Sequence, residues 1–324
     1  MNKIRKIGLF GFGVVGKGVF EILQKHPLPS VKIEKVCVKR LDLERINHDL
    51  YFTTDPDELL NDPSIDIIIE VISDPISAKD IVHKALSNGK AVISANKKMI
   101  AESLHEVNEW HQLYDTPFLY EAAVGGGIPI VYNIDSHFRD QSVTRLRGIL
   151  NGSSNYILTK MQEKNWSFDQ ALANAQKAGF AELNPALDVD GTDAAYKLSI
   201  LAFHSFGEIV SMKMCEIESV RTITDKDVRN ASKKNRKIKP VATVEKIDGE
   251  FLCSVKPEVI KVTDELYNVD DENNAISVHT EISGSHLSVG KGAGSLPTGS
   301  AIVGDLKRVL KGYRYQIQEA SVLA

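Results

Sequence analysis

The residues best suited to chemistry lie in one acidic segment and in the helix that follows it. Residues 181–197 hold four carboxylates and one lysine, which are Glu182, Asp188, Asp190, Asp193 and Lys197. Asp193 and Lys197 are four positions apart, so they share one face of the predicted helix. That helix is apolar on nearly every side, which is typical of a buried helix. The pattern indicates a buried, functional ion pair, and the alternative is an exposed pair beside a solvated loop.

A second segment has the spacing of a dinucleotide-binding turn. The sequence Gly11-Phe12-Gly13-Val14-Val15-Gly16 follows a predicted strand at residues 4–10 and opens a predicted helix at residues 14–24. In this context the first glycine permits a tight turn, the second lets the backbone approach a pyrophosphate, and the third lets helix and strand pack closely. The helix N-terminus supplies amide donors for phosphates. A glycine-rich connection in another α/β fold is the alternative.

Two cations follow the next predicted strand, at residues 31–38. A site selective for NAD normally has Asp or Glu there, where the 2′-hydroxyl of the adenine ribose binds. This chain has Lys39 and Arg40 instead, which favours the 2′-phosphate of NADP. Asp42 lies close by and keeps NAD as an alternative, and the two cations could also be a solvated loop.

The first part of the chain alternates predicted strands and helices. A β-branched apolar run at residues 65–71 is typical of a buried parallel strand. A helix is expected at residues 77–87, with Ser77 as its N-cap, then a strand at 91–94 and a helix at 102–113. This alternation predicts an α/β fold with a Rossmann-type, doubly wound parallel sheet.

The pattern changes near Pro129, which suits the first turn of a helix running to about residue 138. A strand is expected at residues 143–150 and helices at 153–163 and 168–178, the second with a capping box of Ser167 and Gln170. Short strands follow at residues 241–245, 252–255, 275–280 and 286–289. The polar, basic residues 225–239 are expected to form a solvated helix or a mobile flap. We therefore predict an α+β substrate and dimerisation domain at residues 129–297. The dinucleotide-binding domain is then residues 1–128, joined by a C-terminal helix at about 298–324.

Composition excludes several classes of protein. The 324 residues are 43% hydrophobic and 25% charged, with a net charge of -4, so we expect neither nucleic acid nor a membrane as a partner. The predicted first strand leaves no room for a signal peptide. The three cysteines, Cys37, Cys215 and Cys253, are scattered and expected to be lone core thiols. They therefore fit a reducing cytoplasm.

The chain resembles the homoserine dehydrogenase family nearly end to end, in six blocks that occur in the family's order. The blocks are residues 11–18 (GFGVVGKG), 94–98 (SANKK), 121–130 (EAAVGGGIPI), 148–160 (GILNGSSNYILTK), 181–202 and 292–305 (GAGSLPTGSAIVGD). The family interconverts L-homoserine and L-aspartate 4-semialdehyde with NAD(P), in the synthesis of threonine, methionine and isoleucine. The resemblance implies the same reaction here.

The resemblance also assigns roles to single residues. It implies catalytic roles for Lys197, its partner Asp193, and Lys97 of the A-N-K motif. It implies substrate binding by Glu182 and Asp188 and by the turn Asn151–Asn155, in particular Gly152 and Ser153. It places Lys97, Gly292 and Gly294 at the cofactor. In some relatives backbone carbonyls bind a monovalent cation, Na⁺ or K⁺, and the matching positions are Glu121, Val124, Gly126 and Ile128.

Two departures from the family pattern stand out. The family usually has a Gly-Gly pair where this chain reads Ile72-Ser73-Asp74-Pro75, in a loop expected to face the cofactor. The chain also ends at Ala324, so we expect a short form without the C-terminal regulatory domain of many relatives. A homodimer built on the second domain is expected from the resemblance and from strand edges near residues 275–289 that need cover.

Hydride transfer from an alcohol needs a base for the hydroxyl proton. Lys97 follows a strand of the parallel sheet and Lys197 belongs to the second domain, so the two are expected to meet in a cleft between the domains. Two functions of other kinds remain open. A dinucleotide-binding regulatory module would need none of the second-domain acids, and a semialdehyde dehydrogenase would need a thiolate nucleophile.

Overall fold

The structure is a computed structural model that describes residues 3–41 and 50–317, and the chain divides into two compact units. One unit runs to Pro129 and takes in the segment that starts at Ala293, and the other unit is Ile130–Gly292. Asp42 and residues 318–324 of the expected C-terminal helix lie outside the described residues. Within those described, no helix is long and apolar enough to cross a membrane.

The first unit contains a parallel sheet of six strands in the order β3-β2-β1-β4-β5-β6. The strands are β1 (Arg5–Phe10), β2 (Val31–Cys37), β3 (Tyr51–Thr53), β4 (Ile65–Glu70), β5 (Ala91–Ser94) and β6 (Phe118–Leu119). The strand order reverses direction between β1 and β4, which confirms the predicted doubly wound sheet. The apolar run of β4 is buried on both faces, as such a sheet requires.

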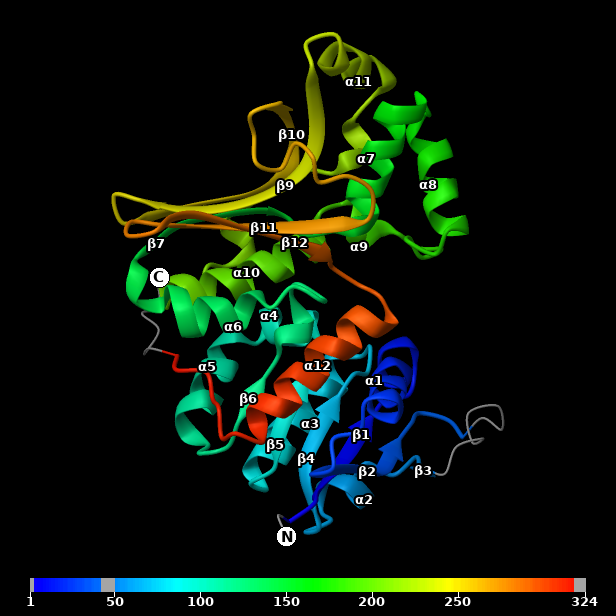
Figure 1. Cartoon of the computed structure of the whole chain (residues 1–324), viewed down its shortest axis with the longest axis vertical. Helices are drawn as coiled ribbons and strands as arrows, with labels where there is room; N and C mark the ends of the chain where they lie inside the picture. The colour runs from blue at the N-terminus through cyan, green and yellow to red at the C-terminus, as the bar shows by residue number, and fades with distance from the viewer. Residues whose placement is uncertain (1–2, 42–49, 318–324) are drawn as a thin grey trace. The chain divides into compact units, whose positions relative to one another are not determined.

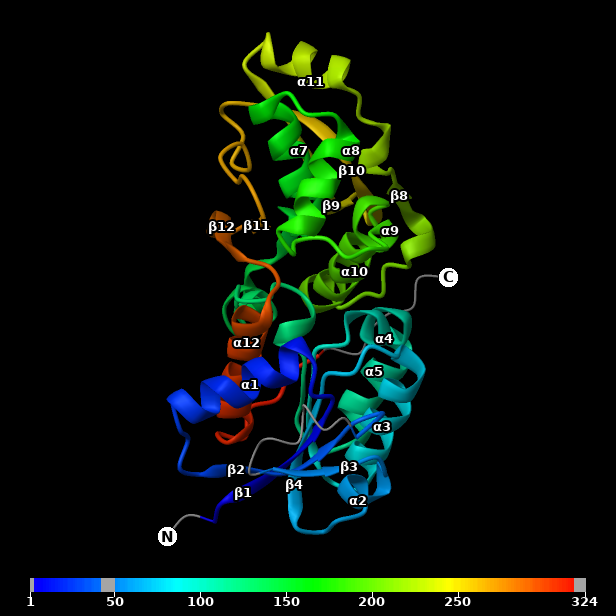
Figure 2. The same cartoon turned by 90° about the vertical axis from the view of Figure 1, so that its right-hand side faces the viewer.

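Helices cover both faces of this sheet (Figure 1 and Figure 2). On one face, α1 (Val14–Lys25) packs against α12 (Ser295–Val309). A Cβ on Gly18 of α1 would lie only 2.3 Å from the Ser295 carbonyl oxygen, so a side chain there would force the two helices apart. The opposite face carries α3 (Pro75–Ser87), α4 (Lys97–Glu102) and α5 (Leu104–Leu113), with the short α2 (Asp57–Leu60) nearby.

Three helix boundaries differ from the predictions. The N-cap of α3 is Asp74, whose carboxylate accepts a hydrogen bond from the Ser77 amide at 2.8 Å, so Ser77 lies inside the helix. Pro75 explains the shift, because proline suits the first helical position. The single helix expected at residues 102–113 is two helices, α4 and α5, which are separated at Ser103. The C-terminal helix expected at about 298–324 ends earlier, because α12 is Ser295–Val309 and the described residues 310–317 are not helical.

The second unit contains a mixed sheet in the order β12-β11-β7-β9-β10-β8. Its strands are β7 (Val143–Ile149), β8 (Cys215–Ile217), β9 (Arg236–Ile247), β10 (Glu250–Lys261), β11 (Asn273–Thr280) and β12 (Gly284–Lys291). The sheet and its helices confirm the predicted α+β architecture. The hairpin of β9 and β10 is far longer than the expected strands 241–245 and 252–255.

The basic segment expected as a solvated helix or flap is wrong in its second half. Only α11 (Asp225–Ser232) is helical, and β9 begins at Arg236. Lys239 is fully buried in β9, where its ammonium donates to Asp270 Oδ1 at 2.7 Å and to the Val269 carbonyl. A paired lysine can occupy a core position that its type alone does not suggest.

The helices of the second unit position the acidic segment. They are α6 (Ile130–Asn133), extended by the π-helix Ile134–Phe138, and α7 (Gly152–Lys164), α8 (Phe168–Lys177), α9 (Ala186–Val189) and α10 (Thr192–Phe206). The capping box of Ser167 and Gln170 at α8 is confirmed. Helices α7 and α10 pack on the sheet through β9 (Figure 1). Most residues of α10 are buried.

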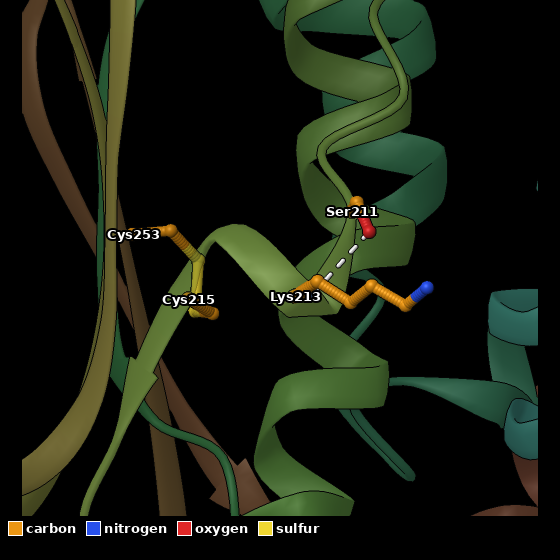
Figure 3. The surroundings of a disulfide bond; sticks show 4 residues. All are labelled: Ser211, Lys213, Cys215 and Cys253. Atoms are coloured by element: carbon orange, nitrogen blue, oxygen red, sulfur yellow. Dashed lines mark hydrogen bonds between the residues drawn. A yellow bond between two sulfur atoms is a disulfide. The ribbon is translucent and has the colours of Figure 1, made fainter.

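A disulfide joins Cys215 of β8 to Cys253 of β10 (Figure 3). The two residues face each other in the parallel register of these strands, although 38 positions separate them in the sequence. The prediction of three lone thiols is therefore wrong, and only Cys37 is free and buried. The pair also removes the cysteine-based argument for a reducing compartment. Just before it, the Ser211 hydroxyl accepts from the Lys213 amide and caps the short 3-10 turn that leads into β8.

Candidate active site

The predicted ion pair is present and buried in the second unit. Lys197 Nζ lies 2.7 Å from Asp193 Oδ2, and the two residues are only 6% and 3% exposed. Gly191 precedes the helix in a left-handed conformation, with φ of 84°, which lets the chain turn sharply from the acidic loop into α10. The alternative of an exposed surface pair is thereby excluded.

A backbone carbonyl is a second acceptor for the lysine. Lys197 Nζ donates to the Leu150 carbonyl oxygen at 2.8 Å, and Asn274 Nδ2 donates to the same oxygen at 2.9 Å. Asn274 is buried in β11 and was not among the sequence candidates. No local motif marks it, because its partner Leu150 lies 124 positions away.

Asn151 connects the two aspartates of the site. Its Nδ2 donates to Asp188 Oδ1 at 2.8 Å and to Asp193 Oδ2 at 2.9 Å. Its Oδ1 accepts from the Ser154 amide at 2.9 Å, so the same side chain caps α7. Asn151 was expected only as a member of the substrate-binding turn 151–155, without a role of its own. Its preference for the N-cap position, directly before a predicted helix, was the signal available.

The other expected substrate-binding residues differ in their burial and in their contacts with the Asn151, Asp188 and Asp193 side chains. A Cβ on Gly152 would lie 2.5 Å from the Glu272 carbonyl oxygen, so only glycine fits there. The Ser153 hydroxyl donates to the Phe180 carbonyl and lies 3.4 Å from Asp188 Oδ2. Glu182 is exposed, and no described hydrogen bond joins its carboxylate to this cluster. Lys197, Asp193 and Asp188 together carry a net negative charge, which suits a cationic group on a ligand.

The glycine-rich turn of the first unit has the shape that a dinucleotide needs. Gly11 has φ of 95°, and a Cβ there would meet the Val71 carbonyl oxygen at 2.9 Å. A Cβ on Gly13 would meet nothing within 4 Å, so the backbone is open to a ligand on that side. A Cβ on Gly16 would lie 2.3 Å from the Gly11 carbonyl oxygen, which explains the third glycine.

The other members of this motif divide between core and surface. The Phe12 side chain is buried edge-on against Phe20 and Phe52, so only its backbone is available to a cofactor. The Val14 side chain is 69% exposed and Val15 is partly buried.

Lys39 and Arg40 are exposed just after β2. The hydroxyl and amide of Ser77 hold the pKa of Asp74 below its usual range, and the charges of Lys39 and Lys98 act in the same direction. Asp74 therefore lies close enough to Lys39 to offset part of its positive charge. This acid belongs to the segment Ile72-Ser73-Asp74-Pro75, which was expected to differ from the family pattern.

Lys97 is the first residue of α4, directly after β5. The N-cap of α4 is Asn96, whose Oδ1 accepts from the Met99 amide at 3.0 Å. Lys97 belongs to the first unit and Lys197 to the second.

Two further glycines had been expected at the cofactor. A Cβ on Gly292 would lie 1.9 Å from Asn274 Nδ2, so this position cannot carry a side chain while Asn274 keeps its place. Gly294 adopts φ of 118° and is the N-cap of α12.

The segment expected to bind a cation begins with the 3-10 turn Glu121–Ala123. The side chains of Glu121, Val124 and Ile128 are buried, and Gly126 has φ of 56°. The Glu121 amide donates to Asp305 Oδ2 at 2.9 Å, which ties this segment to α12. Burial raises the pKa of Asp305 to about 6, against the opposing effect of the Arg308 guanidinium at 2.8 Å.

Known proteins match the chain along almost its whole length. Residues 129–306 match a family model described as homoserine dehydrogenase, and residues 11–117 match one described as its NAD binding domain. The homoserine dehydrogenase of Bacillus subtilis is 34% identical over 96% of this chain and 74% of the relative. That of Lactococcus lactis is 32% identical over 94% and 74%.

Solved structures give the same result. A homoserine dehydrogenase from Thiobacillus denitrificans superposes with a TM-score of 0.92 at 32% identity, covering 99% of this chain and 80% of the other. A mutant of a hyperthermophilic archaeal homoserine dehydrogenase, solved in complex with NADPH, has a TM-score of 0.82 at 25% identity. The match covers 96% of this chain and 99% of the archaeal one.

Proposed function

Because the chain belongs to the homoserine dehydrogenase family, we propose that Lys197 and Asp193 carry the acid–base step of that family's reaction in this protein. The chain is an oxidoreductase that interconverts L-homoserine and L-aspartate 4-semialdehyde, a reaction of threonine, methionine and isoleucine biosynthesis. The chemistry that a bound nicotinamide dinucleotide supplies is hydride transfer to or from the carbon that bears the substrate hydroxyl. The buried Lys197–Asp193 pair is the observation that carries the proposal.

In homoserine oxidation Lys197 Nζ accepts the hydroxyl proton, and in the reverse reaction it returns that proton to the carbonyl oxygen. Two acceptors orient the amine: Asp193 Oδ2 at 2.7 Å and the Leu150 carbonyl at 2.8 Å. Asn151 and Asn274 are positioning residues, because each holds one of these acceptors in place. The arrangement fixes the lysine through hydrogen bonds that do not involve the substrate.

Asp188 and Glu182 are the candidates for binding the substrate ammonium. Asp188 is only partly buried, and Asn151 Nδ2 fixes one of its oxygens. Glu182 extends from the exposed loop before α9 and would add a second negative charge. Gly152 and Ser153 are the first two residues of α7, and the Ser153 hydroxyl lies 3.4 Å from Asp188 Oδ2. Lys97, after β5 of the first unit, is the candidate for the second active-site lysine.

The residues that would hold the cofactor are the backbone of Gly11 to Gly16, together with Gly292 and Gly294. Their fit rests on the open side of Gly13 and on the amides at the start of α1. Lys39 and Arg40 would bind a 2′-phosphate, so NADP is the proposed cofactor and NAD is the alternative.

The cofactor preference can be tested at these two cations. A Lys39→Ala, Arg40→Ala double variant is expected to lose at least tenfold in affinity for NADPH and little for NADH, because charge-assisted bonds to the 2′-phosphate are lost. Titration of both cofactors by fluorescence measures this, and the parent's preference should shrink as salt rises. Lys25→Ala, which removes an exposed cation from the last turn of α1 in the same unit, is the control. A double variant that keeps the parent's preference would contradict the proposal.

The rival functions find less support. A semialdehyde dehydrogenase needs a thiolate, but burial raises the pKa of Cys37 to about 11, and the other two cysteines are joined in a disulfide. A regulatory module leaves the buried ion pair unexplained. An assay that follows the absorbance of NADPH distinguishes these functions. Formation of NADPH from NADP and homoserine supports the proposal. Turnover only with aspartate semialdehyde plus phosphate, or with neither substrate, contradicts it.

Three finer proposals accompany this function. A homodimer would cover the edge strand β12, where Leu287 and Val289 are 40% and 55% exposed, and light scattering should give twice 35.8 kDa.

The carbonyls of Glu121, Val124, Gly126 and Ile128 are the candidate ligands for Na⁺ or K⁺. An unchanged kcat after replacing both cations by tetramethylammonium would exclude this role. A cytoplasmic location rests on the biosynthetic role of the family, and cell fractionation tests it.

A further inference from the structure

Glu70 is a fully buried acid that the proposed reaction does not use. It is the last residue of β4, and in the sheet register it lies between Phe10 of β1 and Ser94 of β5. Burial raises its pKa to about 7, against the opposing effect of hydrogen bonds from Ser94, Ile72 and Asn96. An isolated buried carboxylate is costly, so its retention calls for a reason.

Both carboxylate oxygens of Glu70 have partners at the carboxyl edge of the sheet. Ser94 Oγ donates to Oε2 at 2.5 Å, and the Ile72 amide donates to Oε1 at 2.8 Å. Ser94 Oγ in turn accepts from the Asn96 amide at 3.0 Å. Asn96 Nδ2 donates to the Ile72 carbonyl at 3.2 Å, which closes a ring of hydrogen bonds.

This ring supports the segments that a dinucleotide would meet. Asn96 caps α4, whose first residue is Lys97. The loop after β4 also presses against the glycine-rich turn, because the Val71 carbonyl lies where a Cβ on Gly11 would come within 2.9 Å. In doubly wound sheets ligands bind outside these carboxyl edges, where the strand order reverses.

We propose that Glu70 is a positioning residue for the dinucleotide: as a carboxylate it holds the loop after β4 and the Asn96–Lys97 turn in the arrangement that binds the cofactor. This inference rests on dinucleotide binding at the glycine-rich turn, as proposed above. Glu70 acts through Ser94, Ile72 and Asn96 and is not assigned a contact with substrate.

The ring requires the ionised form of Glu70. A carboxylate accepts from both Ser94 Oγ and the Ile72 amide without conflict. A proton on Oε2 would meet the Ser94 hydroxyl proton, so Ser94 would have to turn its hydrogen away and the hydrogen bond to Glu70 would reverse or break. Protonation therefore loosens the link between β4 and β5, and cofactor affinity falls as pH falls through about 7.

Charged groups on the neighbouring elements do not provide this pH dependence. The titratable side chains at the cap of α3, on α3 and on α4 are Asp74, Lys79, Asp80, His83, Lys84, Lys97, Lys98 and Glu102. None of these is among the causes of the raised pKa of Glu70. The raised pKa comes from the burial of Glu70 itself. Replacing Glu70 should therefore remove the pH dependence of cofactor binding.

The test is a titration of the whole protein with NADPH at pH 6 and pH 8. Glu70→Gln has nearly the same shape but cannot accept from both donors, so we expect about a tenfold weaker Kd at pH 8 and little further change at pH 6. The parent is expected to weaken between pH 8 and pH 6. Ser94→Ala, which removes one link and keeps Glu70, should weaken binding in the same direction. Ser94→Ala also tests the proposal if the Glu70→Gln variant does not fold.

Two further measurements separate positioning from mere stability. Glu58→Gln removes a hydrogen-bonded carboxylate from α2 of the same unit and should leave Kd unchanged. The free energy of unfolding gives an internal check. At Glu70 the folded state binds more protons than the unfolded state between pH 4.5 and about 7, so the contribution of this residue to stability falls as pH rises through that range. Glu70→Gln should therefore lose less stability over this range than the parent, while Asp305, whose pKa is also raised, contributes equally to both.

The outcomes distinguish this inference from the proposed function. If the parent binds neither NADPH nor NADH, the dinucleotide site itself is wrong. If the parent binds but Glu70→Gln keeps its Kd within twofold, or keeps the parent's fall between pH 8 and pH 6, the role of Glu70 is overturned while the function stands.

Discussion

Lys197→Met is expected to lower kcat by about 10²–10⁴-fold, the usual contribution of a positioned proton transfer. Methionine has a similar length and no exchangeable proton, so it fills the space beside Asp193 but cannot act as acid or base. The reaction should slow in both directions, because the same amine accepts the proton in oxidation and returns it in reduction. Steady-state rates with homoserine and with aspartate semialdehyde measure the loss.

A matched control is available in the same unit. Lys239 is also fully buried and paired with an aspartate, Asp270, but it lies in β9, outside the proposed acid–base group. Lys197→Met leaves the buried Asp193 carboxylate without its lysine and should cost about 3–5 kcal/mol of stability. Lys239→Met should cost less, because Asp270 is partly exposed and keeps Lys237 at 2.7 Å. Lys239→Met should therefore lower Tm while the folded fraction keeps its kcat. A loss of less than about tenfold in Lys197→Met, with NADPH binding intact, would exclude the acid–base role.

Sequence patterns predict those features of the molecule that depend on residues close together in the chain. The glycine-rich turn follows from the spacing of Gly11, Gly13 and Gly16, because Gly11 adopts a positive φ and a Cβ on Gly16 would meet the Gly11 carbonyl oxygen. The burial of α10 follows from its apolar circumference, and the Lys197–Asp193 pair follows from the four-residue spacing. These features depend on neighbours within one or two turns of helix.

The rest depends on contacts between distant segments. Asn274 reaches the site only because β11 pairs with β7, which ends beside Leu150. Lys239 reads as part of a solvated basic run, yet Asp270 makes it a core residue. The Cys215–Cys253 pair depends on a three-residue edge strand, β8, that no periodicity reveals. The ring around Glu70 likewise joins side chains from the ends of two strands, so no single segment contains its signal.

Asn151→Asp is expected to lower kcat by about 10²-fold, more than the shorter Asn151→Ala does. The aspartate would place a third carboxylate between Asp188 and Asp193 and would remove the amide that now donates to both. Losing two charge-assisted hydrogen bonds costs about 3 kcal/mol, which corresponds to about 10²-fold in rate if the loss falls on the transition state. The added negative charge also favours the ammonium form of Lys197, so homoserine oxidation should need a higher pH.

Stability should change in the opposite order, and that crossover is the decisive measurement. Asn151 Oδ1 caps α7 by accepting from the Ser154 amide at 2.9 Å, and aspartate can keep this bond while alanine cannot. If Asn151 served only as a cap, the alanine variant would be the more damaged in both kcat and Tm. If Asn151 holds the two carboxylates in register with Lys197, alanine should lower Tm more and aspartate should lower kcat more. Equal rates in the two variants, measured at pH 8 on folded protein, would leave Asn151 as a helix cap without a positioning role.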